Sequence, residues 1–238
     1  MPPPPIDNAA DRRALAPLRT GLSPGAVKGA VLLLHGGRAD ALQPPPRLNL
    51  PALRTRPFAR AILRATVDED ILVAHVRYQY RGWNGHHAHP VTDARRALDE
   101  LHALTGPVPV VLVGHSLGAR AALRAAADPQ VTGVVALAPW CPPAEPVSHL
   151  QGRTVIALHD EADRVTRAQD TWSYLTRAHG AGARVAGISM RRGGHAMIQD
   201  ARLWHRTAAE ATTALLGITP FPAAVEEGFS WNGVPSRL

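Results

Sequence analysis

A serine lies between two glycines near the middle of the chain, in the run GHSLG at residues 114–118. An apolar, β-branched run precedes this serine, Ser116, and an alanine-rich run with helical periodicity follows it. The order predicts a buried strand, a tight turn and a helix, because only glycine tolerates close backbone approach on either side of such a turn. The turn would project the Ser116 hydroxyl out of the sheet at the positive end of the helix. The alternative is a plain glycine-rich turn that carries a surface serine.

A serine hydroxyl is a poor nucleophile at neutral pH, so it needs a histidine base that a carboxylate orients. Both residue types follow Ser116 in the order expected after a strand-turn-helix nucleophile, with the acid before the histidine. Asp160, Glu161 and Asp163 lie at the end of one apolar run, and His195 follows the next, behind two glycines. The pattern indicates a serine, carboxylate and histidine site for acyl transfer.

Six apolar runs alternate with segments of helical periodicity. The apolar runs span residues 30–36, 71–78, 108–114, 131–138, 153–159 and 184–190, and the helical segments span 51–66, 91–104, 117–128, 166–181 and 200–217. Continuous rather than alternating apolar runs are typical of strands that are buried on both faces and covered by helices. We therefore predict an α/β fold with a mainly parallel sheet of six or slightly more strands and helices on both faces. In such a sheet, ligands bind beyond the carboxyl ends of the strands.

Four short motifs occur in an order that is typical of one enzyme family. They are HGG at residues 35–37, GHSLG at 114–118, DRV at 163–165 and GGH at 193–195. On these motifs the chain resembles the α/β-hydrolase superfamily, and more closely the small serine esterases of the dienelactone-hydrolase and carboxylesterase type. The resemblance covers residues 30–217 and implies the α/β-hydrolase fold, Ser116 as nucleophile, His195 as base and no cofactor. It selects Asp163 as the acid, with Asp160, where the family usually has glycine, as the runner-up and Glu145 as a distant third.

Acyl transfer also needs N–H donors aimed at the oxyanion that develops on the substrate carbonyl. We expect one donor to be the backbone amide of Leu117, directly after the nucleophile. By resemblance the other is the amide of Gly37, with Arg38 as the second choice. Trp83, Trp140 and Arg38 follow three different apolar runs, and we expect them to contact the substrate.

Other residues that could bind metal or react are expected to do neither. His86, His87 and His89 lie in one loop, but no carboxylate or thiol accompanies them, so a loop at the pocket mouth is favoured over a zinc site. Cys141 is the only cysteine, which excludes an internal disulfide, and we expect it to be an inert apolar residue. His35 is expected to fix its loop by hydrogen bonding.

The charge of the chain invites a nucleic-acid hypothesis that the residue pattern does not support. There are 26 lysines and arginines against 19 acidic residues, for a net charge of +7. The basic residues are scattered and form no run of five, so we expect no specific nucleic-acid partner. No apolar stretch is long enough to span a membrane, and the first residues lack the apolar core of a secretory signal. We therefore expect a cytoplasmic location.

The sequence predicts one domain at residues 25–217, after a proline-rich, extended lead-in at 1–24 and before a tail at 218–238 that we leave unassigned. We expect a serine hydrolase that cleaves carboxylic esters or thioesters through an acyl-enzyme on Ser116. The alternatives are a cofactor-free perhydrolase or haloperoxidase-like enzyme and a non-catalytic hydrolase-like binding module. Residues 139–152 are too short and too rich in proline for a helical lid, so small or solvent-accessible esters are the expected substrates.

Overall fold

The six apolar runs form strands whose side chains are buried on both faces of one sheet. The computed structural model describes residues 13–18, 24–46 and 48–238. In the strand Gly29–Leu34, for example, Leu32 and Leu34 face one core while Val31 and Leu33 face the other. Each strand must therefore be apolar at nearly every position, which explains the continuous runs in the sequence.

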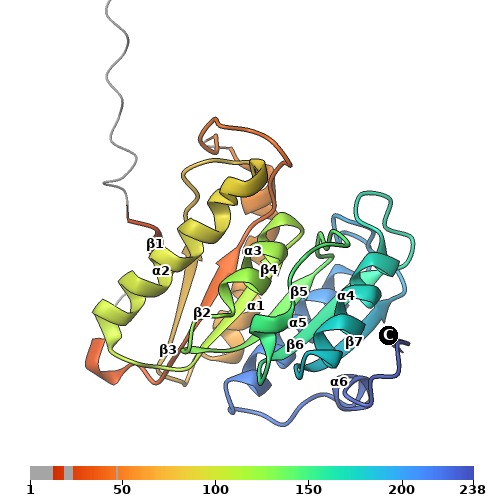
Figure 1. Ribbon diagram of the computed structural model, residues 1–238. Helices are drawn as coiled ribbons and strands as arrows, with labels where there is room; N and C mark the ends of the chain where they lie inside the picture. Colours follow the sequence, from red (N-terminus) through yellow and green to blue (C-terminus); the bar gives the residue numbers. More distant parts are fainter. Residues whose placement is uncertain (1–12, 19–23, 47) are drawn as a thin grey trace, which may run out of the picture.

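The described residues form an eight-stranded sheet in the order β1-β3-β2-β4-β5-β6-β7-β8 (Figure 1). The strands are β1 Leu15–Pro17, β2 Gly29–Leu34, β3 Ile71–Val76, β4 Val110–His115, β5 Val131–Leu137, β6 Thr154–Asp160, β7 Arg184–Met190 and β8 Ser236–Arg237. All pairs are parallel except β1 with β3, which is antiparallel. The predicted α/β fold with a mainly parallel sheet is confirmed.

Helices cover both faces of the sheet and divide the core into two layers. The helices are α1 Leu50–Ala65, α2 His89–Thr105, α3 Leu117–Ala125, α4 Ala168–Gly180, α5 Ala201–Leu215 and α6 Ala223–Gly228. Figure 1 shows α2, α3 and α4 in front of the sheet, where Leu98, Leu123 and Leu175 share one core. Behind it, α1 and α5 supply Ile62 and Trp204 to the second core.

Both edges of the sheet come from segments outside residues 25–217. Strand β1 belongs to the expected lead-in, and the amides of Ala14 and Leu15 each donate to the Glu100 carboxylate at 2.9 Å. The rest of that lead-in, apart from residues 13–18 and 24, lies outside the described residues. The tail that we left unassigned forms α6 and then β8, which pairs with β7. The sheet thus extends past both boundaries of the expected domain.

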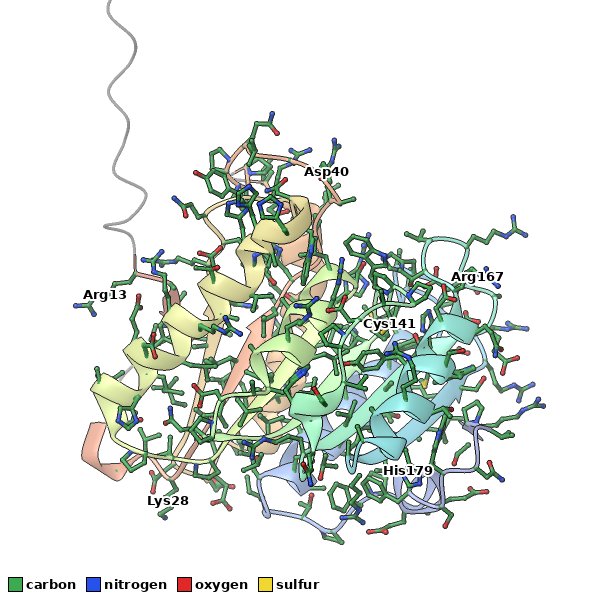
Figure 2. All side chains as sticks on the ribbon, viewed as in Figure 1. Arg13, Lys28, Asp40, Cys141, Arg167 and His179 are labelled. Carbon is green, nitrogen blue, oxygen red and sulfur yellow. The ribbon has the colours of Figure 1, made fainter. Side chains whose placement is uncertain are left out.

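The carboxyl ends of the parallel strands lie at one end of the molecule. Figure 2 shows Asp40 and Arg167, which follow β2 and β6, at the opposite end from Lys28 and His179. Between β5 and β6 the chain forms only the short 3-10 helix η4, Ser148–Leu150, so the expected absence of a helical lid there is confirmed. Among the described residues, none of the helices is long and apolar enough to cross a membrane.

Candidate active site

Ser116 occupies a sharp turn between β4 and α3. Its backbone angles are φ 55° and ψ −119°, a conformation that residues with a Cβ atom rarely adopt. The positions on either side of the turn must be glycine, because neighbouring atoms leave no room there for a side chain. A Cβ on Gly114 would lie 2.5 Å from the Cα of Ala119, and one on Gly118 would lie 2.3 Å from the carbonyl oxygen of Leu34. The spacing of the GHSLG run is therefore a packing requirement of this turn.

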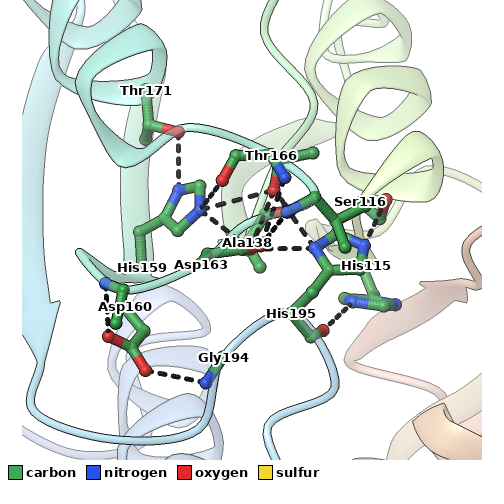
Figure 3. Close-up of polar contacts among 12 residues, drawn as sticks. His115, Ser116, Ala138, His159, Asp160, Asp163, Thr166, Thr171, Gly194 and His195 are labelled. Carbon is green, nitrogen blue, oxygen red and sulfur yellow. Dashed lines mark hydrogen bonds and ion pairs between the residues drawn. The ribbon is translucent and has the colours of Figure 1, made fainter.

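His195 lies between Ser116 and Asp163 (Figure 3). Its Nε2 is 2.9 Å from the Ser116 Oγ, and its Nδ1 is 2.8 Å from the Asp163 Oδ2. With the ring proton on Nδ1, His195 donates to the carboxylate and its Nε2 accepts from the serine hydroxyl. The three side chains follow β4, β6 and β7, so the structure brings together three residues that are far apart in the sequence.

The Asp163 carboxylate accepts hydrogen bonds at both of its oxygens. Its Oδ1 accepts from the backbone amides of Val165 at 2.7 Å and Thr166 at 3.2 Å. Its Oδ2 accepts from the Thr166 hydroxyl at 2.9 Å and from His159 at 3.2 Å, in addition to His195. Burial alone would raise the pKa of this carboxyl, but the hydrogen bonds from His159, His195 and Val165 outweigh it and hold the pKa well below its usual value. Asp163 is therefore charged at neutral pH.

His159 is a second histidine that contacts this carboxylate, and it was not predicted from the sequence. Its side chain is fully buried near the end of β6. The Nδ1 lies 2.8 Å from the Thr171 hydroxyl, while the Nε2 lies 3.1 Å from the Thr166 carbonyl oxygen and also faces Asp163. A neutral ring satisfies all of these contacts if Nε2 carries the proton and Nδ1 accepts from Thr171. The available signal was a polar residue inside an otherwise continuous apolar strand.

Asp160, the runner-up for the acid, contacts the histidine loop rather than the histidine ring. Its Oδ2 accepts from the backbone amide of Gly194 at 2.7 Å, and its Oδ1 accepts from the amide of Ala162 at 2.8 Å. Of the two neighbouring aspartates, Asp163 alone has a hydrogen bond to His195 among the described contacts.

The remaining acidic candidates have other partners. Glu145 is buried, and its carboxylate pairs with Arg120 at 2.6 Å and with Arg124. Glu161 accepts a hydrogen bond from the Ser189 hydroxyl at 3.0 Å. Both carboxylates are therefore engaged away from the histidine.

Two backbone amides near the serine have no acceptor within the part of the chain that the structure describes. They belong to Leu117, at the start of α3, and to Gly37, after β2. The two residues pack together, since a Cβ on Gly37 would lie 3.3 Å from the Leu117 side chain. The Arg38 amide, the second choice for a donor, is already bonded to the carbonyl oxygen of Arg81 at 3.0 Å.

The two tryptophans expected to contact substrate have different surroundings. Trp83 is buried, and its ring centroid lies 3.8 Å from the guanidinium carbon of Arg120. Trp140 is half-buried, lies 4.4 Å from the same guanidinium, and donates its amide to the Ser116 carbonyl at 3.3 Å. Trp140 is therefore the one with surface to offer a ligand. Arg38, the third expected contact, is exposed.

The loop histidines stack on one another. The ring centroids of His86 and His87 are 4.0 Å apart, and those of His87 and His89 are 5.2 Å apart. Asn84 contacts the His89 Nδ1 at 3.0 Å. Among the described residues, no three His, Cys, Asp or Glu side chains are grouped so that they could hold a metal ion. Cys141 is buried, and this burial raises the pKa of its thiol.

Comparisons with known proteins agree with this architecture. A model of the α/β hydrolase fold family matches residues 29–178, more than half of the chain. No curated protein matches the sequence.

Solved structures that resemble the chain include a serine hydrolase without a lid from Xanthomonas campestris, at 17% identity and a TM-score of 0.58 over 87% of this chain and 88% of that one. An esterase domain of a Rhodothermus marinus protein is 18% identical, with a TM-score of 0.54 over 82% of this chain and 88% of that one. A truncated carbohydrate esterase from gut microbiota is 15% identical, with a TM-score of 0.62 over 81% and 87%. At these identities the likeness concerns the fold alone. With the family match and the geometry together, the chain belongs to the α/β hydrolase family.

Proposed function

We propose that this protein is a serine hydrolase that cleaves carboxylic esters or thioesters through an acyl-enzyme on Ser116. The observation that carries the proposal is the hydrogen-bonded series from Ser116 through His195 to Asp163, with links of 2.9 and 2.8 Å. Both distances lie within the range needed for direct proton transfer and for orienting an imidazole.

In the first step, the Ser116 oxygen attacks the substrate carbonyl while its proton passes to the His195 Nε2. The charged Asp163 accepts the Nδ1 hydrogen, which fixes the tautomer and stabilises the imidazolium. His195 then returns the proton to the departing alcohol or thiol, leaving an ester between the acyl group and Ser116. In the second step a water molecule, deprotonated by His195, attacks the acyl-enzyme; the bond to the Ser116 oxygen breaks, His195 returns the proton to that oxygen, and the acid is released.

The oxyanion of each tetrahedral intermediate would accept hydrogen bonds from the Leu117 and Gly37 amides. Their lack of other acceptors in the described structure supports this role. The Leu117 amide also lies at the first turn of α3, where the helix dipole favours negative charge. In comparable enzymes one such donor contributes about 3–4 kcal/mol to the transition state.

We infer that the substrates are small or solvent-accessible esters. The short connection between β5 and β6 places no helical lid over the strand ends, and one structural relative is described as lacking a lid. Two other relatives are named as esterases, which supports the choice of bond. Trp140, beside the turn, and the exposed Arg38 are proposed to contact the substrate.

Hydrolysis of p-nitrophenyl esters with acyl chains of two to twelve carbons, as test compounds, addresses both parts of the proposal. We expect activity that is highest on short chains, is lost in S116A and is kept in S230A, a control at an exposed serine. A fluorophosphonate should add to the wild type and S230A but not to S116A, as measured by intact mass. Full activity in S116A, or a wild type that neither hydrolyses esters nor reacts with the probe, would contradict the mechanism. A steep preference for long chains would contradict the substrate class.

A further inference from the structure

The loop that carries His195 has one internal turn bond, from the Met197 amide to the Gly194 carbonyl oxygen at 3.3 Å. Gly193 and Gly194 precede the histidine with φ angles of 149° and 55°, and neither has a side chain to anchor it. At the start of the loop the indole of Trp204 donates to the carbonyl oxygen of Arg192 at 2.7 Å. That bond holds the entry to the loop, so the backbone at the histidine itself needs further support.

Asp160 holds the backbone directly before the histidine. Its side chain is buried at the end of β6, and its Oδ2 lies 2.7 Å from the Gly194 nitrogen (Figure 3). A hydrogen bond from an amide to a charged carboxylate is shorter and stronger than one between neutral groups. Because the carboxylate also binds the Ala162 amide at 2.8 Å, its own orientation is fixed.

His115 holds the backbone on the other side. This last residue of β4 is buried, and its Nε2 lies 2.9 Å from the carbonyl oxygen of His195. Burial, and then the electrostatic interaction with His195, lower the pKa of His115 to about 3. The ring is therefore neutral at working pH, and its Nε2 carries the proton that it donates to the carbonyl.

We propose that Asp160 and His115 are positioning residues that keep His195 in line with Ser116. The inference rests on the proposed function. Each of two strand ends supplies one partner for the His195 ring and one for the backbone of its loop. The β4 end contributes Ser116 and His115, and the β6 end contributes Asp163 and Asp160. The ring and its loop are thereby bonded to the same two strands. These bonds hold the distance between the His195 Nε2 and the Ser116 Oγ, over which the proton moves.

Removing either support should reduce the catalytic rate without weakening substrate binding. Since a displacement near 1 Å can cost about 100-fold, we expect D160A and H115L to lower kcat about 10- to 100-fold and to leave KM within about twofold. D160N keeps one amide oxygen as an acceptor and H115Q keeps an N–H donor. The loss of kcat should therefore be smaller in D160N than in D160A, and smaller in H115Q than in H115L. The rate at which the fluorophosphonate modifies Ser116 should fall with kcat, because the same base is needed.

The control is T212A, which removes a buried hydrogen bond to Ala208 in α5, away from the loop. All variants are assayed at a temperature well below their own melting points. Three results would each overturn the positioning role. The first is a wild-type kcat in D160A and H115L; the second is a kcat in D160N and H115Q as low as in D160A and H115L; the third is an equal loss of kcat in T212A. If D160A does not fold, the pair H115L and H115Q decides. Failure of the proposed function can be told apart from failure of the positioning role, because in that case the wild type itself would not react with the fluorophosphonate.

Discussion

Replacing Ser116 by glycine should raise the melting temperature relative to alanine at the same position. The backbone at this turn, with φ 55° and ψ −119°, suits glycine and strains any residue with a Cβ atom. The turn cannot relax, because both of its peptide groups are bonded. The Ser116 amide donates to Leu137 at 3.0 Å, and its carbonyl accepts from Arg120 at 3.1 Å and Trp140 at 3.3 Å.

The size of the effect follows from two opposing terms. Backbone strain of this kind costs about 1–3 kcal/mol, and S116G relieves it whereas S116A does not. Glycine also makes the unfolded chain more flexible, which lowers the free energy of unfolding by about 0.4–1 kcal/mol. At the middle of these two ranges the net gain is about 1–2 kcal/mol. Unfolding a chain of 238 residues has an entropy of about 0.5 kcal/mol/K, so S116G should melt about 2–4 °C above S116A.

Differential scanning calorimetry of the two variants at neutral pH measures this difference directly. Alanine is the matched control, because both variants lose the hydroxyl and its hydrogen bond to His195 while only one loses the Cβ atom. Neither variant should hydrolyse esters. If S116G melts at or below S116A, the turn stores no strain and the reasoning is refuted.

Further predictions concern the acid, the thiol and the buried ion pairs. In D163N the His195 ring loses its orienting carboxylate, so kcat on p-nitrophenyl acetate should fall by roughly 10³- to 10⁴-fold, and wild-type activity would exclude Asp163 as the acid. Because folding lowers the pKa of Asp163, its carboxylate stabilises the fold fully at neutral pH and loses that contribution as the pH falls. The melting temperature should thus drop more steeply between about pH 5 and pH 3 in the wild type than in D163N, and parallel curves would contradict this. Cys141 should not react with a thiol reagent at pH 8 until urea unfolds the protein; rapid reaction of the native chain would show that the thiol is accessible. In E145A the half-buried Arg120 loses its partner, so urea denaturation should show a loss of about 3–5 kcal/mol, and an unchanged midpoint would argue against a role in stability.

The central strands were predictable from the sequence, and the edge strands were not. A strand covered on both faces needs an uninterrupted apolar run, so a run such as 184–190 identifies β7 to the residue. Strands β1 and β8 have three and two residues and no periodicity of their own. They exist because β3 and β7 offer unpaired edges, which is a property of the assembled sheet rather than of the local sequence.

The motifs singled out Ser116 and His195, which follow β4 and β7 and lie 2.9 Å apart in the fold, yet they left the carboxylate ambiguous. Asp160 ends β6 and Asp163 follows three residues later, and either could face the histidine as far as the sequence indicates. The difference arises from the direction of the side chains: one carboxylate faces the ring and the other faces the backbone amide of Gly194. His159 was missed for a related reason, since its position near the end of an apolar run does not show that its side chain is buried against Asp163.

At each of the two strand ends, the residue that contacts the His195 ring and the residue that contacts its loop lie close together in the sequence. This affects how the site responds to small movements. His115 and Ser116 are neighbours, so any movement of the β4 end displaces together the two side chains that contact His195 from that strand. The same holds for Asp160 and Asp163 at the end of β6. A small shift of either strand therefore changes two of the four contacts to His195 and its loop and leaves the other two in place. A shift of the His195 loop alone changes all four. For this reason the glycine-rich loop, rather than the strands, is the element whose position most needs to be held by buried hydrogen bonds.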